Sequence, residues 1–172
     1  MIDWPALVRQ NTPLVWRTVY RLVAHDADAA DCLQETFVSA MAVARREPVG
    51  NWPGLLQRLA TARALDCVRR RQRETVHQTP LGSSEAVASA EPNPLQEAVS
   101  RELANRLRLA LADLPGPQAE AFCLRNLNGL SYLEVAKELG VSVDAVGVLL
   151  HRARHRLRDL IGNPDVLQPN ER

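Results

Sequence analysis

Two histidines come nearest to a catalytic or metal-binding pattern in this sequence. His151 and His155 lie four positions apart, so on a helix they would share one side, as the zinc ligands of an H-E-x-x-H motif do. Arginine follows His151 where that motif has glutamate. The sequence also contains no nucleotide-binding glycine loop and no paired-cysteine metal motif. We therefore expect no catalytic residues, no bound metal and no cofactor, and we do not expect an enzyme.

The cysteines are odd in number and far apart, at Cys32, Cys67 and Cys123. This spacing argues against a disulfide framework and favours buried free thiols. No signal peptide precedes the first helical stretch, and no apolar run approaches the length of a membrane span. We expect a cytoplasmic protein without membrane insertion.

The net charge of the chain is only +1, but the charges are unevenly distributed. Residues 51–73 contain six arginines and one aspartate, and residues 151–160 contain four arginines and one aspartate. Residues 74–100, between these segments, contain four glutamates and no lysine or arginine. Two basic segments separated by an acidic spacer predict two surfaces that face DNA.

The second basic segment belongs to a predicted helix-turn-helix over residues 127–161. Ser131 can cap a short helix, and Glu134 completes a capping box with it. Gly140 can end that helix, and Ser142 can cap a long helix from about Val143 to Leu160. A short helix, a glycine turn and a long basic helix are typical of this DNA-binding motif.

The long helix has two different sides at about 100° per residue. The apolar side, expected to pack inward, comprises Val146, Leu149, Leu150, Ala153, Leu157 and Leu160. The residues expected to face the major groove of DNA or its phosphates are Ser142, Asp144, Val148, His151, Arg152, Arg154 and His155. Val148 would either contact a thymine methyl or be a tolerated surface residue. A solvated charged face is the alternative for the whole segment, and the agreement of caps, turn and arginines favours DNA.

Helical patterns continue through the rest of the chain, which predicts an all-α fold of two small domains. We place a first domain at 1–75, a flexible linker at 76–94, a second domain at 95–162 and a tail at 163–172, because proline, glycine and serine gather in the linker. The earlier helices are expected at 7–23, with a break near Pro13 conceivable, then at 28–46 with Asp26 as a cap candidate, and at 52–73, 95–114 and 117–126.

Two of these helices have faces that suit a partner. On the second helix, Asp28, Asp31 and Glu35 share one side with Gln34 at its margin, which fits a docking surface for a basic partner or simply a solvated face. The residues alone favour the solvated face. On the third helix, residues 69–73 are basic on every side, which favours contact with a polyanion over a solvated helix end.

Four stretches resemble motifs of the extracytoplasmic-function (ECF) sigma factors, the small two-domain proteins that direct bacterial RNA polymerase to promoters. Residues 28–37 resemble D-A-E-D-L-x-Q-E-x-F, and residues 52–73 resemble W-L-x-x-I-A-x-N-x-x-x-D-x-x-R-R. Residues 111–124 resemble L-x-x-L-P-x-x-x-R-x-x-x-x-L, and residues 132–154 resemble Y-x-E-I-A-x-x-L-G-x-S-x-G-T-V-K-S-R-L-x-R-A-R. Other helix-turn-helix regulators share the last motif, but the four motifs in this order are specific.

The resemblance implies a role for each surface. The acidic helix would dock on the clamp helices of the largest polymerase subunit, through Asp28, Asp31, Gln34 and Glu35. The opened minus-ten element would be held by Arg45, Arg46, Asn51, Trp52, Arg58, Arg63, Arg69, Arg70 and Arg73, although Trp52 is equally suited to the core. The helix from Val143 would bind the minus-thirty-five element. Core polymerase and promoter DNA are the implied partners, and an anti-sigma factor is a further candidate.

The chain departs from the family pattern at two places. Ala62 stands where the family usually has asparagine, and Gly147-Val148-Leu149 stands where it has K-S-R. These changes predict weaker or differently specified promoter contacts. Two other functions therefore remain open: a helix-turn-helix regulator that needs no polymerase, and a sigma-like protein that acts through protein contacts without initiating transcription.

Overall fold

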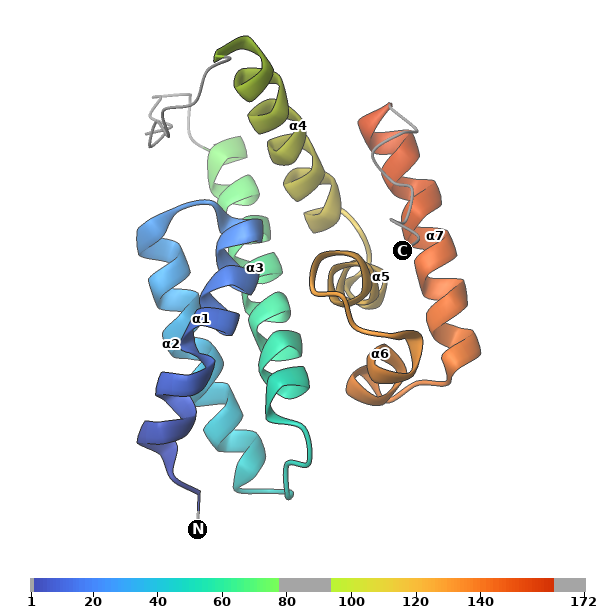
Figure 1. Cartoon of the computed structure of the whole chain (residues 1–172). Helices are drawn as coiled ribbons and strands as arrows, with labels where there is room; N and C mark the ends of the chain where they lie inside the picture. Colours follow the sequence, from blue (N-terminus) through green and yellow to red (C-terminus); the bar gives the residue numbers. More distant parts are fainter. Residues whose placement is uncertain (1, 78–93, 163–172) are drawn as a thin grey trace.

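The computed structural model describes residues 2–77 and 94–162, and within these residues every regular element is helical, which confirms the all-α prediction. Most of the predicted linker and the whole predicted tail lie outside the described residues. The described residues form two groups of helices, one before and one after this gap (Figure 1).

The first half consists of α1 (Trp4–Val23), α2 (Asp26–Ala44) and α3 (Trp52–His77). Each helix presents an apolar side to the other two, because its leucines, valines and alanines recur every three or four residues. The fully or almost fully buried members of this group include Val15, Val19, Ala29, Phe37, Ala40, Leu56, Ala60 and Leu65. In Figure 1, α3 lies between the α1–α2 pair and the second half.

Pro13 lies inside α1 without ending it, so no break occurs there. Proline lacks the N–H that would donate to the Arg9 carbonyl one turn back, so this one helical hydrogen bond is missing. Buried residues on both sides of Pro13 hold the helix in one piece.

The start of α2 also differs from expectation, since Asp26 is its first residue and His25 is its cap. The His25 Nδ1 atom accepts from the backbone N–H of Asp28 at 3.4 Å. The extended backbone of His25 suits a residue that precedes the first helical turn. Asp26 still contributes as an anion at the positive end of the helix.

The second half consists of α4 (Pro94–Ala112), α5 (Gly116–Phe122), a π-helical turn η1 (Cys123–Leu127), α6 (Tyr132–Leu139) and α7 (Val143–Ile161). The π-helical turn was not expected, since one regular helix was predicted over 117–126. The core of the second half contains Leu111, Phe122, Leu124, Val135, Val146, Leu150 and Leu157. The buried apolar residues of both halves form one continuous cluster, and α3 touches α4, α5, η1 and α6. The halves are therefore in direct contact along α3.

The three cysteines are buried and free, as predicted. Burial raises the pKa of the Cys32 thiol and of the Cys123 thiol to about 12, and it also raises the pKa of Cys67. These thiols are therefore almost entirely protonated at neutral pH, and a protonated thiol is a poor nucleophile.

Candidate polymerase and nucleic-acid interfaces

The helix-turn-helix forms as its capping residues predict. The Ser131 hydroxyl accepts from the backbone N–H of Glu134 at 3.2 Å, and the Glu134 carboxylate accepts from the backbone N–H of Ser131 at 2.7 Å. These two bonds complete the capping box, and the hydrogen bonds from Ser131 lower the pKa of Glu134. Gly140 ends α6 in the left-handed conformation, with φ 66°. The turn therefore fixes the direction in which α7 leaves α6.

Helix α7 packs its apolar side against α5 and α6, with Val146, Leu150, Ala153 and Leu157 fully buried. Leu160, predicted to be on this side, is 53% exposed, and Ile161 is buried in its place. In the last turn of α7, before the helix ends at Gly162, the buried position is therefore one residue later than predicted.

The opposite side of α7 is exposed to solvent. Asp144, Val148, His151, Arg152 and His155 are all exposed there, and we call these five residues the open face. Val148 is 49% exposed in the middle of the open face. A thymine methyl or the edge of a base pair could be approached by this face without moving any other helix.

Three residues predicted for the same DNA contact are less free than the rest of α7's outer side. The Ser142 hydroxyl is engaged as the cap of α7, since it accepts from the backbone N–H of Ala145 at 3.1 Å. Arg154 is half-buried, and its Nε atom has no hydrogen-bond partner in the described part of the chain. His155 also has a partner, because its Nδ1 atom lies 3.3 Å from a carboxylate oxygen of Asp159.

The acidic side of α2 is exposed at Asp31, Gln34 and Glu35. The Glu35 carboxylate lies 3.9 Å from Nε of Arg63, and both side chains remain largely exposed, so this pair constrains the surface only weakly. Asp28 is half-buried and forms an ion pair with Arg71 of α3. Asp28 therefore ties α2 to α3, while the other three residues point to solvent.

Asn51 directly precedes α3, and its side chain also reaches the second half of the chain. Its side-chain oxygen accepts from the backbone N–H of Gly54 at 3.2 Å, as a helix cap does. Its amide nitrogen donates to a carboxylate oxygen of Glu138 in α6 at 3.1 Å. Trp52, the next residue, stacks edge-on against Trp4 with ring centroids 5.5 Å apart. This contact gives Trp52 a packing role in the first half.

The arginines predicted for the minus-ten element divide into two groups. Arg45 and Arg46 at the end of α2, and Arg63, Arg70 and Arg73 on α3, are exposed. Arg69 instead donates to the carbonyls of Ala112 and Leu114, at 3.0 and 3.2 Å. Arg58 is half-buried beside two glutamates of the second half, and its Nε atom is buried without a hydrogen-bond partner among the described residues.

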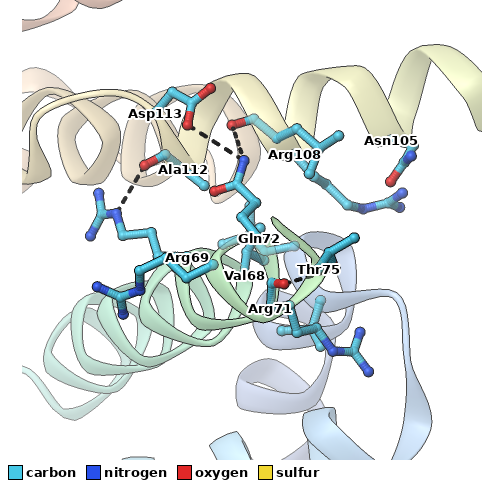
Figure 2. A pocket seen from close by; sticks show the side chains of 13 residues that line it. Val68, Arg69, Arg71, Gln72, Thr75, Asn105, Arg108, Ala112 and Asp113 are labelled. Atoms are coloured by element: carbon cyan, nitrogen blue, oxygen red, sulfur yellow. Dashed lines mark hydrogen bonds between the residues drawn. The ribbon is translucent and has the colours of Figure 1, made fainter. Parts of the chain in front are cut away.

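Further polar contacts join α3 to the second half, and the predicted site residues did not include them. The Asn128 amide donates to the Thr61 hydroxyl at 3.4 Å, and the Gln72 amide donates to the Leu109 carbonyl at 3.2 Å. Figure 2 shows Arg69 and Gln72 donating across to the end of α4. The only hint of this contact in the sequence is that polar Gln57 and Thr61 interrupt the leucines and alanines of α3.

A pocket of roughly 760 Å³ lies beside this contact, between the C-terminal parts of α1, α3 and α4 (Figure 2). Its apolar lining includes Leu22, Val68 and Leu109, and arginines surround them. Arg108, one of these arginines, donates to the Arg21 carbonyl at 2.8 Å, and burial lowers the pKa of its guanidinium.

Two glutamates of the contact have perturbed acidity. Burial raises the pKa of Glu138, although Arg58 and the Asn51 amide act in the opposite direction. Burial likewise raises the pKa of Glu120, against the effects of Arg58 and Arg69. The contact therefore places carboxylates and arginines together in a partly dehydrated space.

Comparison with known proteins shows that each half matches a known family model. Residues 7–74 match the family model described as Sigma-70 region 2, and residues 104–157 match the one described as Sigma-70, region 4. RNA polymerase sigma factor CarQ of Myxococcus xanthus is 30% identical over 91% of this chain and 87% of its own length. The chain belongs to the ECF sigma factor family. The ECF sigma factor SigE of Mycolicibacterium smegmatis is 37% identical over 94% of this chain, which spans 62% of that relative's length.

Two solved structures have a fold similar to that of this sigma factor family member over most of the chain. CnrH in complex with the cytosolic domain of CnrY matches with a TM-score of 0.56 and 22% identity, over 92% of this chain and 87% of that one. RpoE of Bartonella quintana, in complex with the anti-sigma factor NepR, matches with the same TM-score and identity, over 94% and 98%. Region 2 of the family thus corresponds to α1–α3, and region 4 to the helices from the middle of α4 onward. None of the described helices has both the length and the apolar character that crossing a membrane requires.

Proposed function

We propose that this chain binds core RNA polymerase and directs it to promoters, where it supports DNA opening and the start of transcription. The observation that carries this proposal is the match to regions 2 and 4, in order, on two halves that each present a charged surface. The polymerase performs the chemistry, so the chain itself acts as an initiation factor and not as an enzyme. Its place of action is then the cytoplasm, where polymerase and template meet.

Polymerase docking is assigned to the acidic side of α2. Asp31, Gln34 and Glu35 are exposed and lie within one and a half turns of each other. Asp28 contributes mainly by holding α2 against α3 through its ion pair with Arg71. The clamp helices of the largest subunit are the proposed partner surface.

Promoter contacts are assigned to two surfaces. The minus-ten strand would be held by Asn51 and by the arginines at the end of α2 and along α3, with Trp52 supporting this surface from the core. The open face of α7, with Arg154 at its edge and Ser142 as its cap, would enter the major groove of the minus-thirty-five element. Because Gly147 and Val148 replace charged and polar residues of the family pattern, sequence reading there rests on Val148, His151, Arg152 and His155.

An inhibitory protein is a further proposed partner. Both solved structures of similar fold are complexes, and one contains a protein named as an anti-sigma factor. The exposed residues of this chain do not by themselves select one such protein.

Run-off transcription with core polymerase tests the proposed function. We expect the native chain to initiate and an Asp31→Ala/Glu35→Ala variant to fail, because the exposed docking carboxylates are gone. A Glu47→Ala/Glu102→Ala variant is the matched control, since both glutamates are exposed and lie off the acidic side of α2. Undiminished initiation by the first variant would remove the docking assignment.

The same experiment separates the two alternatives. A helix-turn-helix regulator would bind promoter duplex without polymerase and would be indifferent to the Asp31→Ala/Glu35→Ala change. A sigma-like protein that acts only through protein contacts would bind core polymerase and produce no transcript.

A further inference from the structure

The pocket between α1, α3 and α4 has an apolar wall from each of these helices. Leu22 and Val23 come from α1 and Val68 comes from α3, while Leu109 and Ala112 come from α4. Leu109 is 39% exposed, and the other four are buried. The pocket volume of about 760 Å³ lies in the range of small-molecule sites. The two halves of the chain therefore leave between them an apolar space that fits a small molecule.

The charged part of the same lining is almost entirely positive. Among the described residues that line the pocket, Asp113 is the only carboxylate, and it accepts from the Gln72 amide at 3.5 Å. The cations of the lining are Arg69, Arg71, Arg73 and Arg108. This excess of positive charge favours an anion over a neutral molecule or a cation.

Arg108 is a half-buried cation that has no carboxylate partner in the described part of the chain. Its Nε atom donates to the Arg21 carbonyl at 2.8 Å, which leaves the terminal nitrogens of the guanidinium for a ligand. By contrast, Arg71 is paired with Asp28, and Arg69 donates to two backbone carbonyls. Partial burial of a charge costs free energy unless the charge is paired. An anion in the pocket would supply the partner that Arg108 lacks.

The polar groups beside Arg108 lie at one end of the pocket (Figure 2). Arg108 and Asn105 extend from α4 to one side of Gln72, and Arg71 and Thr75 of α3 lie on that same side. Asn105 precedes Arg108 by three positions, so the two side chains are neighbours on α4. An amide and a guanidinium at this spacing can donate to the oxygens of one carboxylate or phosphate group.

We propose that this pocket binds a small amphipathic anion, an apolar chain or ring that carries one carboxylate or phosphate group. The anionic group binds the Arg108 guanidinium with the Asn105 amide beside it, and the apolar part lies against Leu22, Val68 and Leu109. Helices α1 and α3 belong to the first half and α4 to the second, so the ligand contacts both halves and stabilises the folded chain by mass action. Binding needs neither polymerase nor promoter, and it can be measured on the free chain whether or not the chain initiates transcription.

A single strand of DNA is the other anion that these arginines would attract. Its phosphates repeat along a backbone and would bind exposed arginines such as Arg73 without entering the apolar space. The buried Leu22 and Val68 in the lining instead favour a ligand whose apolar part reaches inside.

A chain-length series tests the apolar part of the site. Hexanoate, octanoate and decanoate are titrated into the native chain by calorimetry, below the concentrations at which they form micelles. We expect affinity to rise by up to about fourfold per added methylene, because each CH₂ that enters the pocket leaves water. Decyltrimethylammonium, which has an apolar chain of the same length and the opposite charge, should bind at least about tenfold more weakly than decanoate. Affinity that is independent of chain length, or equal affinity for the cation, would overturn the proposal.

An arginine substitution tests the anionic part. Arg108→Gln removes the charge and keeps a side chain of similar shape, and it should weaken decanoate binding at least about tenfold. Arg106→Gln is the matched control, because Arg106 is exposed on the same helix, lies outside the pocket lining and pairs with Glu102 at 2.9 Å. It should bind decanoate as the native chain does. Equal affinities of the native chain and Arg108→Gln would overturn the proposal.

A second variant decides the question if Arg108→Gln loses helical ellipticity. Leu109→Gln makes the apolar wall polar at a position that is already 39% exposed, so the fold should tolerate it. We expect decanoate affinity to fall about threefold. Val99→Gln, at an exposed position of α4 outside the lining, should cause no loss. Equal affinities of the two variants would count against the site.

The same chemistry occurs in free metabolites and in membrane lipids, and two further measurements separate these sources. Decanoate and decyl phosphate should raise the Tm of the native chain if the ligand is a free anion. Sedimentation with phosphatidylglycerol vesicles but not with phosphatidylcholine vesicles, abolished by Arg108→Gln, would identify the ligand as a lipid. Neither a raised Tm nor sedimentation would overturn the proposal. A chain that binds a single-stranded oligonucleotide through Arg108 and none of these anions would overturn it in favour of DNA.

Discussion

Helices α3 and α7 are both long and rich in arginine, yet they have different surroundings. Four elements of the second half touch α3, and two of its arginines are held by carbonyls or lie beside carboxylates. Helix α7 lies at the outside of the second half and keeps its open face free (Figure 1). The second half thus covers one side of α3, and Arg63, Arg70 and Arg73 of the same helix remain exposed.

This difference suggests a division of labour between the two surfaces. The open face of α7 is exposed in the free chain, while Arg58 and Arg69 of α3 are engaged by the second half.

The largest effect is expected from core substitutions that unfold one half and leave the other folded. Leu150→Ala should destabilise the second half by about 2–5 kcal/mol, because Leu150 is fully buried in α7. All three tryptophans lie in the first half, so their fluorescence reports α1–α3 alone, while circular dichroism reports both halves. In urea, we expect ellipticity to be lost before tryptophan fluorescence changes. Coincident transitions would show instead that the halves unfold as one unit.

Single arginine substitutions should distinguish the open face of α7 from the side of α3 that the second half covers. Arg152→Ala should weaken binding of the free chain to promoter duplex by about tenfold and reduce the salt dependence by about one phosphate contact. Arg69→Ala should leave this binding unchanged, because Arg69 donates to the Ala112 and Leu114 carbonyls. Fluorescence anisotropy at several salt concentrations measures both quantities. Equal losses for the two variants would mean that Arg69 is accessible to DNA in the free chain.

A smaller effect is expected from the valine at the centre of the open face. Val148→Ala should weaken duplex binding by about threefold if Val148 contacts a thymine methyl. Replacing individual thymines of a selected binding site by deoxyuridine removes the methyl alone, and one such replacement should reproduce the loss in the native chain but not in the variant. Val99→Ala is the control, since Val99 is exposed on α4. Additive losses at every thymine would leave Val148 as an ordinary surface residue.

The smallest effect is expected from pH, because the carboxyls involved are only partly buried. The raised pKa values of Glu120 and Glu138 mean that the packed halves bind more protons than separated halves would. Separation of the halves should therefore become easier as pH rises above the ordinary range of a glutamate carboxyl, and harder as pH falls. The groups that face these carboxyls are Arg58, Arg69, Asp66, Lys137, Glu134 and the Asn51 amide. Energy transfer between dyes on the two halves measures the change, and a Glu120→Gln/Glu138→Gln variant should respond less.

Much of the fold could be predicted from local sequence. The apolar spacing of each helix, the Ser131 and Ser142 caps and the glycine at 140 predicted α6 and α7 to within a residue or two, because these signals act between neighbours along the chain. The exposed acidic residues of α2 and the open face of α7 follow in the same way from helical periodicity. The roles of these surfaces in polymerase and promoter binding stay predictions.

Only the tertiary structure decided which charged residues are free. Arg69 and Arg70 are adjacent and identical in type, yet one is held by the carbonyls of residues 112 and 114 and the other is exposed. Thr61 meets Asn128, and Asn51 meets Glu138, across 67 and 87 positions of sequence. Periodicity places a side chain on one side of its own helix, but it carries no information about which distant helix packs there. That depends on how two complete halves fit together, and here the fit covers one side of α3 and leaves the open face of α7 exposed.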